Sequence, residues 1–326
     1  MPPARKVPKL HKKAISVKKG TEFSDILRQQ FVVGKEIGQG GFGRIYEGIE
    51  KSTKKSVAIK MEPQGNGPLF TEMHVYMRIL KVDMLEDWKR LKGLKFIGLP
   101  QYISSGSFTY ENTEIRFLVI PKFAISLESI RESKPGNIFS VNETMCIAKT
   151  ILYSLAYLHD QNYVHGDVKA SNLMLESKTG YDLSHVVLID FGLARKLPDE
   201  IIEKENKKQA HNGTPLFTSC DAHRGCLPSF RGDFEILIHN MLYWICGSLP
   251  WQDCTNDLEK VFQQKKAFIS NAKKEIIKLI PEKKVALSIA NLYSLSSKMA
   301  FIDKIDLEEA LKLLINIKEG KEIENK

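Results

Sequence analysis

The segment at residues 165–172 reads His-Gly-Asp-Val-Lys-Ala-Ser-Asn, and an apolar stretch then leads to an Asp-Phe-Gly triplet. This spacing constrains the chain more than any other feature, because phosphoryl transfer depends on a few charges held in a fixed arrangement. In such an arrangement Asp167 orients the attacking hydroxyl, and Lys169 neutralises charge on the phosphate in transit. Asn172 and Asp190 supply oxygen ligands for magnesium. The two segments predict a site that transfers phosphate from a nucleotide.

A glycine-rich turn lies between two runs that we predict to be strands, residues 31–37 and a run through Ile45. Glycines let backbone amides approach phosphates closely, and an aromatic side chain at the tip would shield the site from water. A dinucleotide-binding loop would open a helix instead, so a hairpin flap over a nucleotide fits better. The turn residues with these roles are Gly38, Gly40, Gly41, Phe42 and Gly43.

A lysine ends the next predicted strand, at residues 57–60. Burying its ammonium among small and branched side chains is costly unless the charge has partners. Twelve residues later, Glu72 lies in a segment whose apolar positions recur at helical spacing. We predict that Lys60 pairs with Glu72 and with the α- and β-phosphates of ATP.

An adenine-binding slot is predicted around the connection at residues 121–123. The carbonyl of Pro121 and the amide of Phe123 would offer the acceptor and the donor that the edge of adenine needs. Apolar side chains would enclose the ring, with Ile120 at the back of the slot. The enclosing residues are Ile37, Ile45, Ala58 and Met174.

The binding site for the phosphate acceptor is predicted at residues 213–219. There, Thr214 would link Asp167 to Lys169 through its hydroxyl, an arrangement typical of serine/threonine-specific enzymes. Asp233 opens an apolar helix, so it would brace the backbone of the 165–172 loop or cap that helix. The two roles of Asp233 are compatible.

These motifs resemble those of the protein kinases, and within them the casein kinase I group and its vaccinia-related kinases. The resemblance extends from about residue 30 to 315 and rests on residues 37–43, 67–72, 163–172, 217–223 and 247–251. It implies an α+β, bilobal protein kinase fold, with a small antiparallel β-rich N-lobe containing one helix and a larger, mainly helical C-lobe. It also implies a nuclear serine/threonine kinase that uses ATP with Mg²⁺, or Mn²⁺, on chromatin proteins such as histone H3 or barrier-to-autointegration factor.

Three positions depart from the family pattern without removing a catalytic group. Phe191 stands where this family commonly has tyrosine, and Pro121 and Ala124 alter the surroundings of the hinge. A fourth position, Gly166, stands where most protein kinases carry an arginine that binds a phosphate on the activation segment and orders it. We therefore expect that phosphorylation within residues 193–217 is not required for activity through such a contact, and that packing orders this segment.

We predict four parts along the chain: a basic, disordered arm at 1–25, an N-lobe at 26–120, a C-lobe at 121–318 and a short polar tail at 319–326. The helical pattern at residues 82–91 is assigned to the first lobe. In the second lobe, a long helix is predicted from Val141 to Gln161. Ser140 and Glu143 precede and open this helix in the pattern of a capping box.

The composition is that of a soluble globular protein, with 43 % hydrophobic and 27 % charged residues. The sequence contains neither an apolar run long enough for a membrane helix nor, at its amino terminus, the apolar core of a secretory signal. Five cysteines, an odd number, argue against a disulfide framework. Cys220, His223 and Cys226 resemble part of a zinc site, but a fourth ligand is not evident. We expect an intracellular monomer without membrane attachment.

The formal net charge is +9, and the first twenty residues contain seven lysines and arginines and no acidic residue. This arm has two interpretations of equal weight: a functional one, as a nuclear import signal or a weak nucleic-acid contact, and a solvated tail without such a role. Nuclear localisation is expected, with a cytoplasmic location as the alternative.

Two other classes of function compete with an active kinase. A pseudokinase scaffold would bind nucleotide without transferring phosphate, but the residues that transfer requires are all present. A chromatin-binding module would use the basic arm and keep the kinase fold as a platform. Salt-sensitive DNA binding that is lost on deletion of residues 1–20 would support that module.

Overall fold

The computed structural model describes residues 14–40, 43–198 and 202–319, and the chain folds into two compact units. The first unit contains the described residues up to 82 together with residues 101–122. The second unit contains residues 83–100 and the described residues from 123 onward. An antiparallel sheet dominates the first unit and helices dominate the second, so the predicted α+β class is confirmed.

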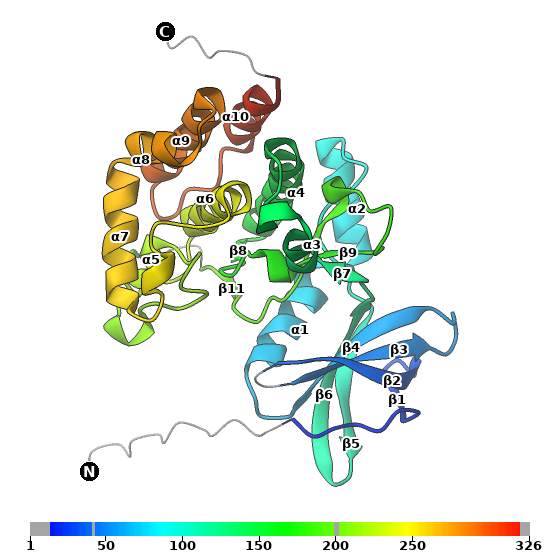
Figure 1. The fold of residues 1–326 in the computed structure, drawn as a ribbon. Helices are drawn as coiled ribbons and strands as arrows, with labels where there is room; N and C mark the ends of the chain where they lie inside the picture. Colours follow the sequence, from blue (N-terminus) through cyan, green and yellow to red (C-terminus); the bar gives the residue numbers. More distant parts are fainter. Residues whose placement is uncertain (1–13, 41–42, 199–201, 320–326) are drawn as a thin grey trace, which may run out of the picture. The chain divides into compact units, whose positions relative to one another are not determined.

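Six antiparallel strands form the sheet of the first unit (Figure 1), in the order β1-β2-β3-β4-β6-β5. One face of the sheet is covered by an apolar core that includes Phe31, Tyr46, Ile59 and Phe117. Because successive side chains of a strand point to opposite faces, the residues beside these in sequence lie on the other face. The strands are β1 (Glu22–Ser24), β2 (Gln30–Gln39), β3 (Arg44–Glu50), β4 (Ser56–Pro63), β5 (Ser104–Tyr110) and β6 (Thr113–Pro121).

The structure differs from the predicted disordered arm at residues 14–25. Within this stretch, β1 pairs with β2, and Val17 and Phe23 are buried in the apolar core of the sheet. The backbone N–H of Val17 also donates a hydrogen bond to the Tyr46 hydroxyl at 2.9 Å. Val17 and Phe23, although lysines lie near them in the sequence, therefore hold residues 14–25 against the sheet, because its core and strand β2 supply their partners. The first thirteen residues lie outside the described part of the chain.

Helix α1 (Pro68–Ile79) packs against β4 and β6 within the first unit. Proline suits the start of a helix, where its missing N–H has no intrahelical partner to lose. The buried side of α1 includes Leu69, Tyr76 and the carboxylate-bearing Glu72. The helix predicted around Glu72 is thus present, and it places that residue on its packed face.

The second unit is built around α4, which packs against α6 and α10, while α9 packs against α6, α8 and α10 (Figure 1). Helices in the described part of the chain do not combine the length and apolarity needed to cross a membrane. The helices are α2 (Val82–Lys92), α3 (Leu127–Ser133), α4 (Val141–Asp160), α5 (Cys220–His223), α6 (Phe230–Cys246), α7 (Leu258–Ser270), α8 (Ala272–Leu279), α9 (Lys283–Lys298) and α10 (Leu307–Glu319). Short strands are β7 (Ile125–Ser126), β8 (Tyr163–Val164), β9 (Leu173–Leu175), β10 (Val187–Leu188) and β11 (Arg195–Lys196).

Helix α4 begins with the predicted capping box. The Ser140 hydroxyl accepts a hydrogen bond from the Glu143 N–H at 3.3 Å, and the Glu143 carboxylate accepts one from the Ser140 N–H at 2.9 Å. Each side chain satisfies a backbone donor that the first turn leaves free. This confirms the predicted start of the helix that leads into the 165–172 loop.

Helix α2 belongs to the second unit, whereas the sequence interpretation placed it in the first. Trp88 donates a hydrogen bond from Nε1 to Asp160 at 2.9 Å and packs edge-on against Tyr157, with ring centroids 5.6 Å apart. The Gly98 carbonyl accepts hydrogen bonds from Ser154 Oγ at 3.0 Å and from the Leu188 N–H at 2.9 Å. Periodicity identified the apolar side of the helix but not the core that covers it.

Candidate active site

The 165–172 loop joins two of its charged side chains to Thr214. The Thr214 hydroxyl donates a hydrogen bond to Asp167 Oδ1 at 2.6 Å, and Lys169 Nζ donates one to Thr214 Oγ1 at 2.9 Å. Lys169 Nζ also lies 2.7 Å from Asp167 Oδ2, which closes a triangle of contacts. The predicted link through Thr214 is therefore present. Both charged side chains remain partly accessible, 12 % for Asp167 and 26 % for Lys169, so a substrate can reach them.

Hydrogen bonds join Asn172 to Asp167 and join the segment before Asp190 to Asn172. Asn172 Nδ2 donates hydrogen bonds to Asp167 at 2.9 Å (main-chain O) and 3.2 Å (Oδ2). Because its amide nitrogen faces Asp167, the amide oxygen points away from that residue. The Ile189 N–H donates to the Asn172 carbonyl at 2.9 Å, which joins the segment before Asp190 to the loop. Asp190 has φ +65°, a left-handed conformation that is strained for a residue with a side chain.

A buried carboxylate, Asp233 in the first turn of α6, supports the backbone of the loop. It accepts hydrogen bonds from the His165 N–H at 2.8 Å and the Gly166 N–H at 2.7 Å. Its Oδ2 also lies 3.1 Å from His159 Nε2. The N-cap of α6 is Ser229, so Asp233 bonds the loop rather than its own helix start. Of its two predicted roles, the structure supports the brace.

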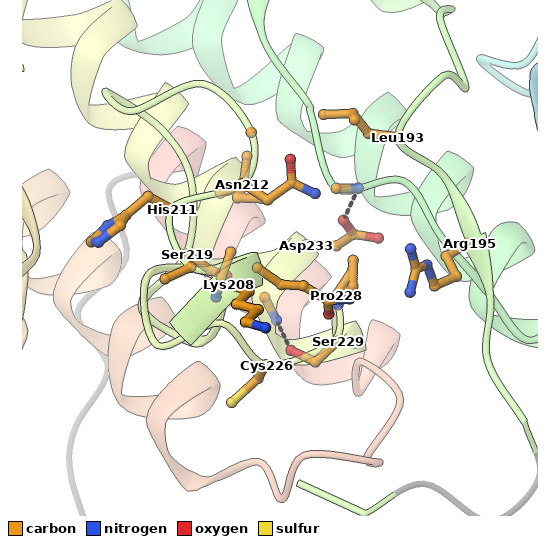
Figure 2. A pocket seen from close by; sticks show the side chains of 17 residues that line it. Leu193, Arg195, Lys208, His211, Asn212, Ser219, Cys226, Pro228, Ser229 and Asp233 are labelled. Carbon is orange, nitrogen blue, oxygen red and sulfur yellow. Dashed lines mark hydrogen bonds between the residues drawn. The ribbon is translucent and has the colours of Figure 1, made fainter. Parts of the chain in front are cut away.

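Gly166 lies at a pocket of about 380 Å³ in the second unit (Figure 2). Its φ of +78° is in the left-handed region, which glycine adopts without the strain that a Cβ would cause. The side chains of Arg195 and Lys208 also line this pocket, as does Asp233. Positive charge is therefore available in the pocket, but residue 166 contributes no side chain to it.

In the first unit, Lys60 of β4 and Glu72 of α1 form the predicted ion pair, with Nζ and Oε2 2.5 Å apart. The Glu72 side chain is only 3 % exposed, while that of Lys60 is 25 % exposed. A carboxylate so deeply buried requires a charged partner. The pairing predicted from the cost of burying these charges is confirmed.

Four of the residues predicted to bind nucleotide lie together on the sheet face opposite the apolar core. In the strand registers, Ile45 of β3 lies opposite Lys60 of β4, and Ala58 of β4 lies opposite Ile120 of β6. Directly opposed residues of antiparallel strands project from the same face. The face thus presents three apolar side chains around one ammonium group. Ile37 on β2 is 43 % exposed.

The glycine-rich turn is a hairpin between β2 and β3, as predicted. Gly40 N–H donates to the Gly43 carbonyl at 2.9 Å and closes the turn. A Cβ on Gly43 would lie 2.6 Å from the Met61 carbonyl oxygen, so only glycine fits there. Gly38, by contrast, has ordinary space around it. Gly41 and Phe42 lie outside the described residues.

The predicted hinge coincides with the boundary between the two units, which falls after Lys122. This is two residues later than the boundary inferred from the sequence. Pro121 ends β6 in the first unit. Phe123 and Met174 belong to the second unit, where the neighbouring Ala124 N–H donates to the Leu175 carbonyl of β9 at 2.8 Å. The adenine-contacting residues predicted from the sequence are thus divided between the units.

Comparison with known proteins agrees with this geometry. The family model described as "Protein kinase domain" matches residues 31–305. The chain is 42 % identical over 96 % of its length to "Serine/threonine-protein kinase VRK1" of Caenorhabditis briggsae, of which it covers 56 %. It belongs to the vaccinia-related kinase family of protein kinases. The family resemblance inferred from the motifs is confirmed.

Two further matches define the extent of the similarity. "Nucleosomal histone kinase 1" of Drosophila melanogaster is 36 % identical over 84 % of this chain, which covers 46 % of that relative. The solved structure of vaccinia related kinase 3 superposes with a TM-score of 0.81 at 25 % identity, covering 94 % of this chain and 93 % of that one. The chain spans about half the length of the curated nematode relatives that it matches, 56 % and 51 %.

An ion-pair cluster on the activation segment was not predicted from the sequence. Asp221 of α5 is buried and accepts hydrogen bonds from Arg231 Nε at 2.8 Å and Arg224 Nη2 at 2.6 Å. Glu203 joins both arginines, including Arg231 Nη2 at 2.9 Å. Burial acts to raise the pKa of Asp221, but hydrogen bonds from Arg231, Ser229 and Arg224 hold that pKa below its usual value. The cluster ties the segment at residue 203 to α5 and α6.

The zinc site considered for Cys220, His223 and Cys226 finds no support among the described residues, where groups of three metal-ligating side chains do not occur. Burial raises the pKa of both thiols, which favours their neutral form. His223 packs on Phe262 and contacts His211. These residues serve packing and hydrogen bonding in the second unit.

Proposed function

We propose that this chain is a serine/threonine protein kinase that transfers the γ-phosphate of ATP to hydroxyl groups of proteins. The observation that carries the proposal is the triangle of Asp167, Lys169 and Thr214, all three contacts of which are between 2.6 and 2.9 Å. The acceptor hydroxyl would donate a hydrogen bond to the Asp167 carboxylate, which would orient it for attack. Lys169 would offset negative charge as the phosphoryl group moves.

The predicted site residues fit a divalent cation and a nucleotide. Carboxylate and amide oxygens are the ligands that Mg²⁺ prefers, and Asp190 and Asn172 offer one of each. When bound, Mg-ATP supplies the transferable phosphate and neutralises its charge. The Lys60–Glu72 pair fixes the ammonium that would bind the α- and β-phosphates. Pro121 and Phe123 would hydrogen-bond adenine, and the apolar residues around Ala58 would enclose it.

Chromatin proteins are the proposed substrates, with histone H3 and barrier-to-autointegration factor as candidates. Two observations support this proposal: a relative at 36 % identity is named "Nucleosomal histone kinase 1", and the chain has a net charge of +9. A basic protein is attracted to the DNA phosphates of chromatin. A nuclear location follows from the same proposal.

Phosphate incorporation from labelled ATP into histone H3, nucleosomes, barrier-to-autointegration factor and dephosphorylated casein tests both parts of the proposal. We expect transfer to at least one chromatin substrate about tenfold or more above casein at equal concentration. Chelation by EDTA should abolish transfer, and excess Mg²⁺ or Mn²⁺ should restore it. Labelling of casein alone would contradict the chromatin substrates, and silence on every substrate would contradict the kinase activity.

We further propose that this kinase is active without phosphorylation of its activation segment. From residue 193 to 217 the sequence contains a single hydroxyl side chain, Thr214, and that hydroxyl is bonded to Asp167. Gly166 offers no arginine fork for a phosphate. Glu203 instead supplies a fixed negative charge to Arg224 and Arg231, and the Arg224 hydrogen bond lowers the pKa of Glu203.

Bacterially expressed protein treated with phosphatase should therefore retain activity within twofold of the untreated sample. Glu203→Gln should lower activity about 2- to 5-fold, because ion pairs of this exposure contribute about 0.5–1 kcal/mol. Glu205→Gln is the matched control, since Glu205 makes one contact with Arg224 at 3.2 Å. Negligible activity after phosphatase treatment that returns on phosphorylation would refute the proposal.

A further inference from the structure

A fully buried lysine, Lys265 of α7, contacts the acceptor segment of the second unit. Its Nζ donates hydrogen bonds to the carbonyl oxygens of Pro215 at 2.8 Å and Thr218 at 2.6 Å. A third contact, 3.3 Å long, joins it to His223 Nε2. The ammonium also lies over the Trp251 ring, 5.5 Å from its centroid. Burial of an ammonium is costly, so its placement under this segment needs an explanation beyond packing.

The Leu216 and Phe217 carbonyls lie between the two carbonyls that Lys265 binds, and they are bonded to buried side chains as well. Trp251 Nε1 donates to the Leu216 carbonyl at 2.8 Å, and His239 Nδ1 lies 2.9 Å from the Phe217 carbonyl oxygen. Four consecutive carbonyls, from residue 215 to 218, are thus directed into the protein. Lys265 binds the first and the last of them and so fixes the length and direction of the turn.

This turn follows directly on Thr214. The Phe217 and Thr218 N–H groups donate to the Thr214 carbonyl at 2.9 and 2.8 Å, so the position of the turn sets that of Thr214. The Thr214 hydroxyl in turn bonds Asp167. A continuous path of hydrogen bonds therefore runs from the buried ammonium to the residue proposed to orient the acceptor hydroxyl.

One acidic side chain beside Lys265 partly offsets the cost of burying its charge. Glu235 of α6, with a side chain 12 % exposed, lies beside it. Burial lowers the pKa of Lys265 and raises that of Glu235, each to about 7, while the attraction between the two charges works against both shifts. The imidazoles of His223 and His239 add no second cation, because burial lowers the pKa of each. The thiol of Cys220 is held neutral, since burial raises its pKa. Lys265 thus has one acidic neighbour and no second cation beside it among these groups.

We propose that Lys265 is a positioning residue for the protein acceptor: its ammonium clamps the Pro215 and Thr218 carbonyls and so holds the acceptor segment in register with Asp167. This inference rests on the proposed function, in which residues 213–219 bind the acceptor. The clamp acts on the acceptor and not on the nucleotide. Loss of the ammonium should therefore affect the two substrates unequally.

Steady-state kinetics of Lys265→Met test the clamp, with one protein acceptor used throughout and the concentrations of acceptor and ATP varied in turn. Methionine is unbranched and close to lysine in length, so it fills the space without donating hydrogen bonds. We expect kcat/KM for the acceptor to fall about tenfold or more, while KM for ATP stays within twofold. Lys266→Met is the matched control, because Lys266 is the adjacent, exposed lysine of α7, and it should match the wild type.

The single variant leaves the partly buried Glu235 carboxylate without its cation, which lowers stability. A second variant, Lys265→Met combined with Glu235→Gln, removes both charges and should recover the melting temperature without recovering acceptor kcat/KM. Recovery of catalysis together with stability would show a purely structural lysine and overturn the proposal, as would equal losses for ATP and acceptor. An inactive wild type would instead contradict the proposed function, so the two failures are distinguishable.

Discussion

Asp167→Asn should lower kcat for phosphate transfer to a protein acceptor about 10²- to 10⁴-fold, the usual contribution of a positioned acid–base group. Asparagine keeps the size of the side chain and one oxygen for the Thr214 hydroxyl. It loses the negative charge that pairs with Lys169 at 2.7 Å and that would accept the acceptor proton. The residual activity should measure what binding and electrostatic stabilisation contribute without this carboxylate.

The measurement is kcat with a saturating acceptor, together with the affinity for Mg-ATP by calorimetry. Nucleotide affinity should stay within about threefold of the wild type, because an acceptor-orienting group contributes little to ground-state nucleotide binding. Asp87→Asn is the control, since Asp87 lies on α2 in an exposed pair with Arg90. If the Asp167 variant kept more than a third of the wild-type kcat, Asp167 would have no part in the chemical step.

Much of this site could be predicted from the sequence because several of its residues lie close together along the chain. Asp167, Lys169 and Asn172 lie within one loop, so their spacing alone brings them together. The Lys60–Glu72 pair could be inferred for another reason: a lysine inside an apolar strand requires a partner, and a helix follows at once. The hairpin was predictable because β-favouring residues flank the glycines.

Other features could not be inferred because they depend on which distant surface covers a segment. The buried side of α2 contacts Tyr157 and Asp160, seventy residues away along the chain, and no periodicity specifies such a partner. β1 is fixed by its pairing with β2, although its surroundings in sequence are basic. The sequence does contain one sign that Lys265 is buried, because it shares the buried side of α7 with Val261 and Phe268 at helical spacing. The carbonyls that it binds were not visible in the sequence.

Asp233→Ala should reduce the free energy of unfolding by about 2–6 kcal/mol, because the His165 and Gly166 N–H groups would each be buried without an acceptor at about 1–3 kcal/mol apiece. Transfer activity should fall about tenfold or more in the folded fraction, since the loop that carries Asp167 would lose its fixed backbone. Asp233→Asn keeps one accepting oxygen and turns an amide N–H₂ toward the other donor, so its losses should be smaller.

Urea unfolding and kcat, measured on the same samples, distinguish a role of Asp233 as a brace of the loop from a role as an ordinary helix cap. Asp257→Ala is the comparison, because the Asp257 carboxylate caps α7 by accepting the Lys260 N–H at 3.1 Å, and removing such a cap costs about 1 kcal/mol. If Asp233 merely favoured the start of α6, both alanine variants would lose similar stability and keep their kcat. A brace predicts that stability and kcat fall together at residue 233 alone, because the carboxylate that accepts the two loop N–H groups also sets the conformation of Gly166 beside Asp167.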